Sequence, residues 1–181
     1  MKKKNSLIQI RPARLSDVKA IAEVHIRSWN ETYAGLIPDD FLKAISLSSK
    51  IVQWTTSVEL ALKHHANSQV LVAEKSGKIV GFSSFGKSRG KIPGYSAEVY
   101  AIYMLKKFHG QGVGKRLMEE SIQWSRDQGL QNMGLWVLEG NPTLQFYERM
   151  GFQKLGLIEV VDFGGNKRKH LALGLSLHSG H

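Results

Sequence analysis

Three glycines, Gly110, Gly112 and Gly114, occupy alternate positions between an apolar run and a segment with helical spacing. Glycine costs about 1 kcal/mol relative to alanine inside a helix, so such a cluster at a helix start indicates a turn whose backbone must be reachable. A strand that enters a helix through this turn offers free backbone N–H groups at the positive end of the helix dipole. The spacing predicts an anion-binding site. A glycine-rich turn that binds no ligand is the alternative.

Two common phosphate-binding loops do not fit this segment. The P-loop needs serine or threonine after its Gly-Lys pair, and here Arg116 follows Gly114 and Lys115. It also needs glycine at the position of His109. The dinucleotide-binding fingerprint needs its third glycine three positions after the second, whereas Gly112 and Gly114 are two positions apart. The turn therefore matches neither of these two loops.

The composition excludes several classes of chemistry. The chain has 181 residues, which suits one domain, and it is 42% hydrophobic and 22% charged. The absence of cysteine excludes disulfides, thiolate nucleophiles and zinc-thiolate sites. The histidines lack partners at metal-ligand spacing, so we expect no metal. No apolar run approaches the roughly 18 residues that cross a membrane, and no signal-peptide core is present. We therefore expect a cytoplasmic protein with no membrane partner.

A formal net charge of +10 favours an anionic partner, which could be nucleic acid, a membrane surface or a phosphorylated cofactor. A solvated basic surface is the alternative. Aromatic residues interleaved with arginines, which are typical of RNA-binding sheets, are missing, so we expect no nucleic-acid partner.

Hydrophobic periodicity divides the chain into strands and helices with no repeat and no linker. A first helix begins after Ser16 and ends before Gly35. Strands are expected at 7–13, 69–86 (a hairpin), 96–105, 132–139, 151–163 and 167–175, and further helical segments at 39–65, 113–128 and 142–150. This alternation predicts an α/β fold in which a central sheet has helices on both faces.

Three segments resemble one family. The glycine segment HGQGVG, residues 109–114, resembles the pyrophosphate loop Gln/Arg-x-x-Gly-x-Gly/Ala of the GNAT superfamily of N-acetyltransferases, with His109 at the Gln/Arg position. LEGNPTLQFYERMGF, residues 138–152, is similar to the second signature of that family. SWNETYAGLIPDDFL, residues 28–42, is similar to the segment between the first two helices of one large bacterial branch. Lys106 departs from the proline that is common after the preceding strand.

The resemblance covers most of residues 7–175 and implies a single acetyltransferase domain over residues 1–181. It implies a mixed, mostly antiparallel central sheet of six to seven strands with helices on both faces, in a monomer or a homodimer. The activity implied is direct transfer of an acetyl group from acetyl-CoA to a primary amine of a small molecule or peptide, in a ternary complex. A non-catalytic acyl-CoA-binding module is the alternative.

The resemblance also assigns the residues that hold acetyl-CoA. Loop amides would bind the pyrophosphate, and the strand before the loop would hold the acetyl and pantetheine parts. Asn141 would bond the pantetheine amides, with a helix cap as its alternative role. The residues so assigned are Tyr103, Met104, Leu105, His109, Gly110, Gln111, Gly112, Val113, Gly114, Lys115, Asn141 and Phe146.

A general base is needed, because deprotonating a lysine-like amine at neutral pH costs about 4 to 5 kcal/mol. Glu98 lies eleven residues before His109, where histone-modifying members of the family carry their glutamate base. The resemblance therefore implies that Glu98 is the base, with a salt-bridged carboxylate as the alternative. The strand period of two places Glu98, Tyr100, Ile102 and Met104 on one face.

Tyr147 matches the tyrosine that protonates the departing CoA thiolate in the family, and a tyrosine packed on the core beside Phe146 is the alternative. In this branch Trp29 and Tyr33 should line the acceptor side, although four-residue spacing on one helix face fits core packing equally well. The basic surface disfavours polycationic acceptors and leaves peptides, amino acids or small drugs.

Overall fold

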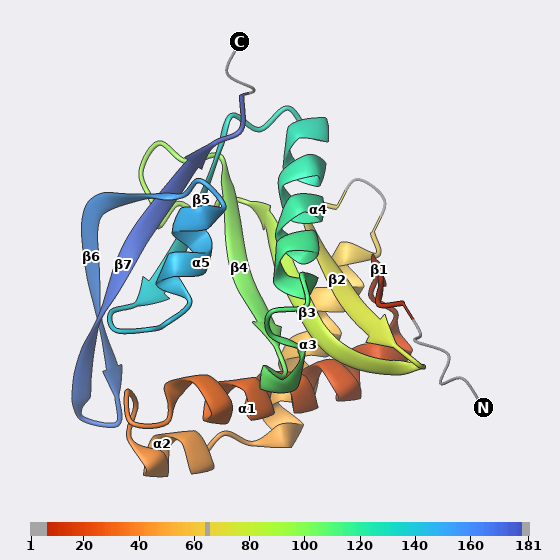
Figure 1. Ribbon diagram of the computed structural model, residues 1–181, viewed down its shortest axis with the longest axis vertical. Coiled ribbons are helices and arrows are strands. Elements are labelled where there is room, and N and C mark those ends of the chain that lie inside the picture. The colour runs from red at the N-terminus through yellow and green to blue at the C-terminus, as the bar shows by residue number, and fades with distance from the viewer. Residues whose placement is uncertain (1–6, 64–65, 179–181) are drawn as a thin grey trace.

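The computed structural model describes residues 7–63 and 66–178, which form one seven-stranded sheet with helices on both faces (Figure 1). The strands lie in the order β1-β2-β3-β4-β5-β7-β6, and only the β4–β5 pair among these strands is parallel. Their bounds are β1 Gln9–Pro12, β2 Ser68–Lys75, β3 Lys78–Lys87, β4 Ala97–Met104, β5 Asn132–Leu138, β6 Gln153–Phe163 and β7 Asn166–Ser176. The predicted mixed, mostly antiparallel sheet is confirmed.

The helices are α1 Val18–Tyr33, α2 Asp39–Lys43, α3 Leu47–Ala61, α4 Val113–Asp127 and α5 Leu144–Arg149, with short 3-10 turns at Leu15–Asp17 and Lys106–Phe108. None of the described helices is long and apolar enough to span a membrane. The segment 39–65, expected to be helical throughout, forms α2 and α3 instead. The helix is interrupted before Leu47, where α3 begins. The side chain of Ser46 accepts a hydrogen bond from the backbone N–H of Ser49 and caps this second helix. Residues 64 and 65 of that prediction lie outside the described residues.

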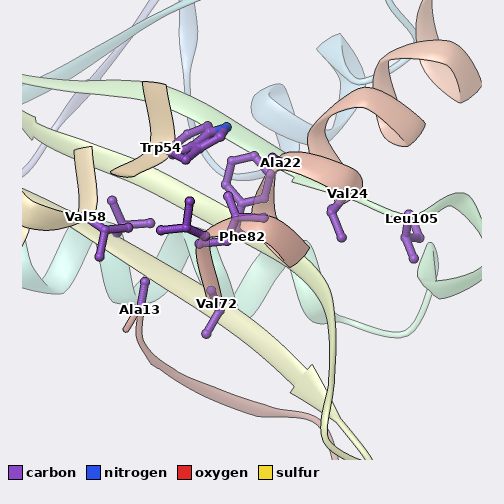
Figure 2. Close-up of a cluster of buried hydrophobic side chains, with 11 residues drawn as sticks. Ala13, Ala22, Val24, Trp54, Val58, Val72, Phe82 and Leu105 are labelled. Atoms are coloured by element: carbon purple, nitrogen blue, oxygen red, sulfur yellow. The ribbon is translucent and has the colours of Figure 1, made fainter. Parts of the chain in front are cut away.

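Two hydrophobic layers hold the sheet. On one face, α1 and α3 cover β2 and β3, and Figure 2 shows Phe82 of β3 among Ala22, Trp54 and Val58. The rings of Trp54 and Phe82 meet edge to face with centroids 4.7 Å apart, and both side chains are buried. On the other face, α4 and α5 pack on β4, β5 and β7 through side chains such as Met118. Both faces of the sheet are therefore covered by packed side chains.

The two parallel strands diverge in the middle of the sheet. Their register runs only from Ala97 opposite Met133 to Val99 opposite Leu135. Beyond Val99, β4 stays paired with β3 alone, while β5 stays paired with β7. Figure 1 shows β4 and β5 separating toward their C-terminal ends. The divergence opens a wedge in the sheet that side chains or a ligand must fill.

A β-bulge at Tyr100 shifts the alternation of β4. Phe85 of β3 lies opposite Val99 and Ser84 lies opposite Ala101, which leaves Tyr100 as an extra residue. Beyond the bulge Ile102 and Met104 pack against α4, whereas Tyr100 stacks with Arg89 on the opposite side, where Tyr103 contacts α1. The prediction that Glu98, Tyr100, Ile102 and Met104 share one face is therefore wrong, because one inserted residue reverses the order of faces.

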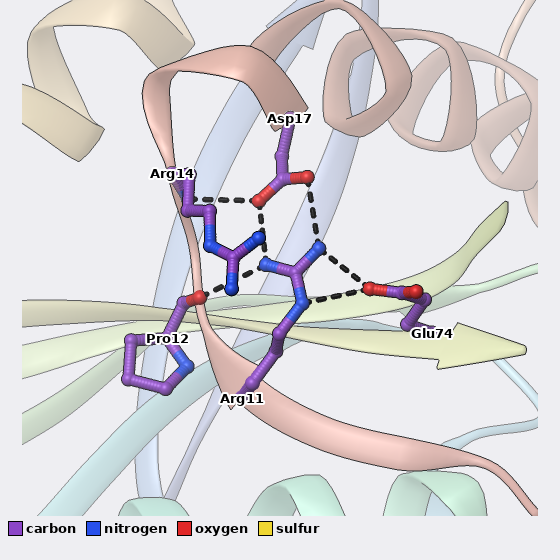
Figure 3. Close-up of polar contacts among 5 residues, drawn as sticks. All are labelled: Arg11, Pro12, Arg14, Asp17 and Glu74. Atoms are coloured by element: carbon purple, nitrogen blue, oxygen red, sulfur yellow. Dashed lines mark hydrogen bonds and ion pairs between the residues drawn. The ribbon is translucent and has the colours of Figure 1, made fainter. Parts of the chain in front are cut away.

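The start of α1 is fixed by an ionic network around Arg11 of β1 (Figure 3). Its guanidinium bonds Asp17 through both terminal nitrogens, at 2.7 and 3.0 Å, and reaches Glu74 of β2 at 2.7 Å. The Asp17 carboxylate also accepts the backbone N–H of Arg14 at 2.8 Å. This network joins β1, β2 and the turn before α1. It therefore sets the origin of the helix that carries Trp29 and Tyr33 toward the sheet.

Candidate active site

A cavity of about 520 Å³ occupies the wedge between β4 and β5, beside the first turn of α4 and α5. It brings together most of the residues expected to bind acetyl-CoA, together with one expected acceptor residue and one expected catalytic residue. These predicted residues are Tyr33, Tyr103, Met104, His109, Gly110, Gly112, Val113, Gly114, Lys115, Asn141, Phe146 and Tyr147. Segments that are distant in sequence thus meet at one site.

The glycine turn leads directly into α4. Gly110 and Gly112 have left-handed backbones, with φ of 72° and 76°. A Cβ at either position would meet open space, so these glycines are needed for their backbone conformation. Gly114 serves packing instead, because its Cβ would lie 2.6 Å from Cε of Met104. Gly112 stands at the N-cap without a capping side chain, so the first amides of α4 border the cavity uncapped.

The loop around these glycines is held by its own polar contacts. The backbone N–H of Lys106 donates to Glu31 of α1 at 2.7 Å, and Glu31 also accepts Arg27 at 2.9 Å. Burial acts to raise the pKa of Glu31, but these two hydrogen bonds outweigh it and the pKa is lowered. Glu31 is therefore an anion at the cavity edge that fixes the end of β4.

Two residues predicted to bind acetyl-CoA have other contacts. Leu105 is 7% exposed, packs in the core beneath α1 and does not line the cavity. Gln111 does not line it either, and its side-chain amide donates to the carbonyl of Lys107 at 2.9 Å. His109 lines the cavity and places Nε2 3.4 Å from the carbonyl of Met104. Leu105 and Gln111 thus shape the turn from behind.

Three phenols converge on the wedge from different elements: Tyr33 from α1 and Tyr147 from α5 are buried, and Tyr103 from β4 is partly buried. Burial raises the pKa of each, and Tyr103 acts electrostatically on the other two. All three are therefore neutral hydrogen-bond donors at pH 7. Asn141 beside them is 6% exposed, and its side-chain oxygen accepts the backbone N–H of Thr143 at 2.9 Å. This bond closes the turn before α5, whose N-cap residue is Thr143.

A second cavity of about 300 Å³ adjoins the first. The two share Tyr33, Tyr100, Tyr103 and Trp136, which form a common wall. Trp29, expected on the acceptor side, lines this second cavity with apolar side chains, and four polar or charged groups complete it: Arg89, Lys91, Glu159 and His170. The site thus has two compartments of different character that meet at one set of aromatic side chains.

Glu98, the predicted base, lines neither cavity. It is 2% exposed, and Arg89 binds it three times. Oε2 accepts the backbone N–H of Arg89 at 3.0 Å, and Oε1 accepts Nε at 3.1 Å and also Nη2. The guanidinium of Arg89 also lies over the ring of Tyr100, 4.3 Å from its centroid. The structure therefore brings Glu98 to the site through Arg89.

The sequence signature described as the acetyltransferase (GNAT) family matches residues 29–152. The chain belongs to this family. A relative, the uncharacterized N-acetyltransferase YuaI of Bacillus subtilis, is 32% identical over 169 residues, covering 93% of this chain and 92% of the relative. The L-amino acid N-acyltransferase MnaT of Escherichia coli is 29% identical over 147 residues, which are 80% of this chain and 79% of MnaT.

Solved GNAT structures have the same fold. The PaiA N-acetyltransferase of Thermoplasma acidophilum, crystallised with coenzyme A, gives a TM-score of 0.76 at 21% identity, covering 94% of this chain and 99% of that one. YncA of Salmonella typhimurium, with acetyl-CoA, gives 0.70 at 22% identity and covers 97% of each chain. Family membership confirms the predicted acetyl-CoA-dependent acetyltransferase. Among the described residues no cluster of His, Asp or Glu could hold a metal ion.

Sequence reasoning missed three residues of this GNAT site: Glu31, Arg89 and Trp136. Arg89 lies in a polar, glycine-containing loop between β3 and β4 that has no periodicity, and only its pairing with Glu98 reveals its place. Trp136 lies in β5, where an apolar run predicts a buried strand and gives no hint of the wedge. Glu31 is four residues after Arg27, and this spacing predicts an ordinary ion pair on the surface of a helix.

Proposed function

We propose that this enzyme transfers an acetyl group from acetyl-CoA to a primary amine of a small molecule or peptide while both substrates are bound. The observation that carries the proposal is the wall shared by the two cavities, formed by Tyr33, Tyr100, Tyr103 and Trp136. A donor in one compartment and an acceptor in the other would meet at this wall. Direct transfer needs such an arrangement because the reacting atoms must approach to about 3–3.5 Å.

The larger cavity suits the donor. Its left-handed glycines and the uncapped first turn of α4 supply backbone N–H groups for a diphosphate, and Lys115 adds a positive charge at the same edge. Met104 and Tyr103 line the path from this turn to the shared wall. For Leu105 and Gln111, direct contact with acetyl-CoA stays a prediction, and their present contacts support an indirect role in shaping the turn.

Tyr147 is the proposed acid. It is buried at 8% exposure and lines the donor cavity, and its raised pKa keeps the phenol protonated at neutral pH. A thiol has a pKa of about 8.5, below that of this phenol. The role best supported is therefore a hydrogen bond to the leaving sulfur as negative charge develops there, worth most in a site that excludes water.

The base role of Glu98 stays a prediction. Both of its carboxylate oxygens are already used by Arg89, which supports a positioning role instead. His170 lines the second cavity, and burial lowers its pKa, so that its imidazole is neutral at pH 7. We propose that the amine proton leaves through His170 or through water in this cavity.

The smaller cavity is the proposed acceptor compartment, and its lining includes Trp29 and Tyr33, the residues that the resemblance assigns to the acceptor side. Two of the relatives are named for acceptor classes that contrast in charge. MnaT is named for L-amino acids, and a Thermoplasma acidophilum relative, 23% identical over 155 residues, is named a spermidine N(1)-acetyltransferase. The two classes carry opposite charge beside the amine, so the charges that line this cavity bear on the choice.

One assay tests the proposal against the alternative of a non-catalytic acyl-CoA-binding module. Purified chain is mixed with acetyl-CoA and a panel of primary amines, and release of the CoA thiol is followed. We expect amine-dependent release. Thermal stabilisation by CoA without release under any amine would favour the binding module, because a ligand of the folded state raises apparent stability without any turnover.

Three further expectations remain proposals: a cytoplasmic location, a monomer or homodimer, and the lack of a nucleic-acid partner. Salt-sensitive binding to unrelated DNA would contradict the last of these, because phosphate contacts release counterions and weaken steeply with salt.

A further inference from the structure

We infer that the acceptor is an α-amino acid with an apolar side chain, and that its carboxylate binds the free edge of the Arg89 guanidinium. This inference rests on the proposed function and deepens it by naming the acceptor class. It follows from which donors of Arg89 are used and from what surrounds them in the second cavity.

The hydrogen-bond inventory of Arg89 leaves one edge open. A guanidinium has five N–H groups in a fixed fork. Nε and Nη2 each donate to Oε1 of Glu98, and Nη1 has no hydrogen-bond partner among the described residues. The side chain of Arg89 is 54% exposed and lines the cavity, whereas that of Glu98 is 3% exposed. The buried carboxylate therefore anchors one edge of the fork, and the other edge is left without a protein partner among the described residues of this compartment.

Arg89 is also held in orientation. Its guanidinium lies over the Tyr100 ring at 4.3 Å, and its backbone N–H is tied to Glu98. Because Glu98 holds one edge of the guanidinium and Tyr100 holds one face, the Arg89 side chain loses little further rotamer freedom when it binds a ligand. Arginine pairs with carboxylates through two parallel N–H···O bonds, so a preset fork of this kind suits a carboxylate.

The other charges of the cavity do not offer the same site. Lys91 faces Glu159 across 3.7 Å, and His170 is neutral at pH 7 because burial lowers its pKa. Apart from the tyrosines and tryptophans of this cavity, the remaining lining is apolar: Ile37, Leu138, Val161 and Phe163. An acceptor that fits this set carries one anionic group for Arg89 and an uncharged, apolar remainder.

The position of Arg89 also limits the distance between carboxylate and amine. Tyr100 belongs to the wall where the two cavities meet, and Arg89 stacks directly on its ring. A carboxylate on Arg89 therefore lies beside the wall at which the amine must react. An α-amino acid, in which one carbon separates the two groups, keeps its amine close to a carboxylate bound there. A polyamine would place a second cation against Arg89 and be repelled.

The test compares matched acceptors in the thiol-release assay. L-leucine, L-methionine and L-phenylalanine are each measured beside their carboxamide and beside the amine that lacks the carboxylate, with spermidine as the polycation. We expect kcat/KM for the amino acids to exceed that of both analogues by about 10-fold or more, the worth of a charge-assisted hydrogen bond. The carboxamide amine is less basic, which favours its acetylation, so a preference for the acid is a stringent result.

Variants then assign the preference to Arg89. In Arg89→Gln we expect the advantage of the amino acid over its analogues to disappear, while CoA affinity measured by calorimetry stays unchanged. Arg89→Gln leaves Glu98 buried without its partner, so the double variant Arg89→Gln/Glu98→Gln removes both charges together and must give the same loss. Arg126→Ala is the control: among the described residues, the side chain of this exposed arginine bonds only the Leu177 carbonyl, at the C-terminal end of α4, and the preference should survive.

The outcomes separate the two levels of the argument. Equal or better acetylation of the carboxamide, the amine or spermidine would overturn the carboxylate site and leave the proposed transferase intact. A preference that persists in the double variant would overturn the role of Arg89. Binding of CoA without acetylation of any amine would refute the proposed function itself.

Discussion

Trp54 of α3 donates a hydrogen bond from Nε1 to Nδ1 of His25 on α1 over 3.0 Å. The same imidazole stacks on the ring of Tyr103 with centroids 5.1 Å apart. Because Nδ1 accepts, the neutral imidazole carries its proton on Nε2. Three elements are thus joined directly behind the wall that the two cavities share, and the joint requires a neutral histidine.

The protonation of His25 predicts how stability depends on pH. Burial, helped by the nearby charge of Lys50, lowers the pKa of His25 from 6.5 to about 3. Between these two pH values His25 is protonated in the unfolded chain and neutral in the folded chain. The free energy of unfolding is therefore intact above pH 6.5 and falls as the pH drops toward 3. The expected slope is about 1.4 kcal/mol per pH unit. His25→Gln, which can still accept from Trp54, should lack this contribution. The free energy of unfolding of both proteins is measured by denaturation from pH 7 to pH 5. The same loss of free energy in His25→Gln as in the unaltered protein would contradict the assignment.

The glycine turn predicts a separation between stability and ligand affinity. Gly112→Ala forces a left-handed backbone at φ 76° on alanine, which should cost about 1–2 kcal/mol and displace the amides at the start of α4. Gly129→Ala, with φ 70° and equally open space at the other end of α4, is the matched control. Both should unfold earlier in urea, but only Gly112→Ala should bind CoA more weakly by calorimetry. Equal CoA affinities in the two variants would remove the turn from the donor site.

The sequence predicts well the features that depend on neighbours within one segment. Hydrophobic periodicity predicts the strands and α4, and glycine spacing predicts the turn before α4. The wedge has no signal within one segment, since β4 and β5 are separated by a helix in sequence. The bulge at Tyr100 had no local signal, and the single inserted residue reversed the faces of β4.

The acceptor side depends on pairings across the chain. Arg89 and Glu98 come from a loop and a strand, and Trp136 comes from β5. These residues come together only because β4 and β5 separate in the fold. The residue types alone do not predict that separation. The role of His25 likewise depends on a pairing across the chain, because its imidazole accepts a hydrogen bond from Trp54 of α3.

Asp17 predicts a measurable role for the network around Arg11. The hydrogen bond from Arg11 is the main cause that lowers the pKa of Asp17, so its contribution to stability is present above an ordinary pKa of about 3.9 and is lost as the pH falls through the folded value. Asp17→Asn should cost about 1–3 kcal/mol at pH 7, because a partly buried guanidinium loses a charged partner. Glu23→Gln, which breaks an exposed pair with Lys19, should cost under about 1 kcal/mol. Equal losses in urea titrations would show that the network contributes no more than a surface pair.

Tyr147→Phe isolates the proposed hydrogen bond to the leaving sulfur. The ring contacts with Phe146 and Phe152 remain, so folding and CoA affinity should be unchanged. We expect kcat to fall by about 100-fold, at the lower end of the range for acid catalysis. Tyr95→Phe, in the loop before β4, is a control that should retain full turnover. Full turnover in Tyr147→Phe would leave this tyrosine as core packing only.

Glu98→Gln distinguishes the two roles that this carboxylate could have. If it positions Arg89, the variant should raise KM for the acceptor, keep the shape of the kcat profile against pH, and show little added effect when combined with Arg89→Gln, because both changes break one unit. If it is the base, kcat should fall chiefly near neutral pH and recover at alkaline pH, where the amine is already deprotonated. Glu148→Gln, which loosens a surface pair with Lys154, controls for the loss of one negative charge. The contacts of Glu98 with Arg89 favour the first result, and an alkaline recovery in the variant would return the base role to it.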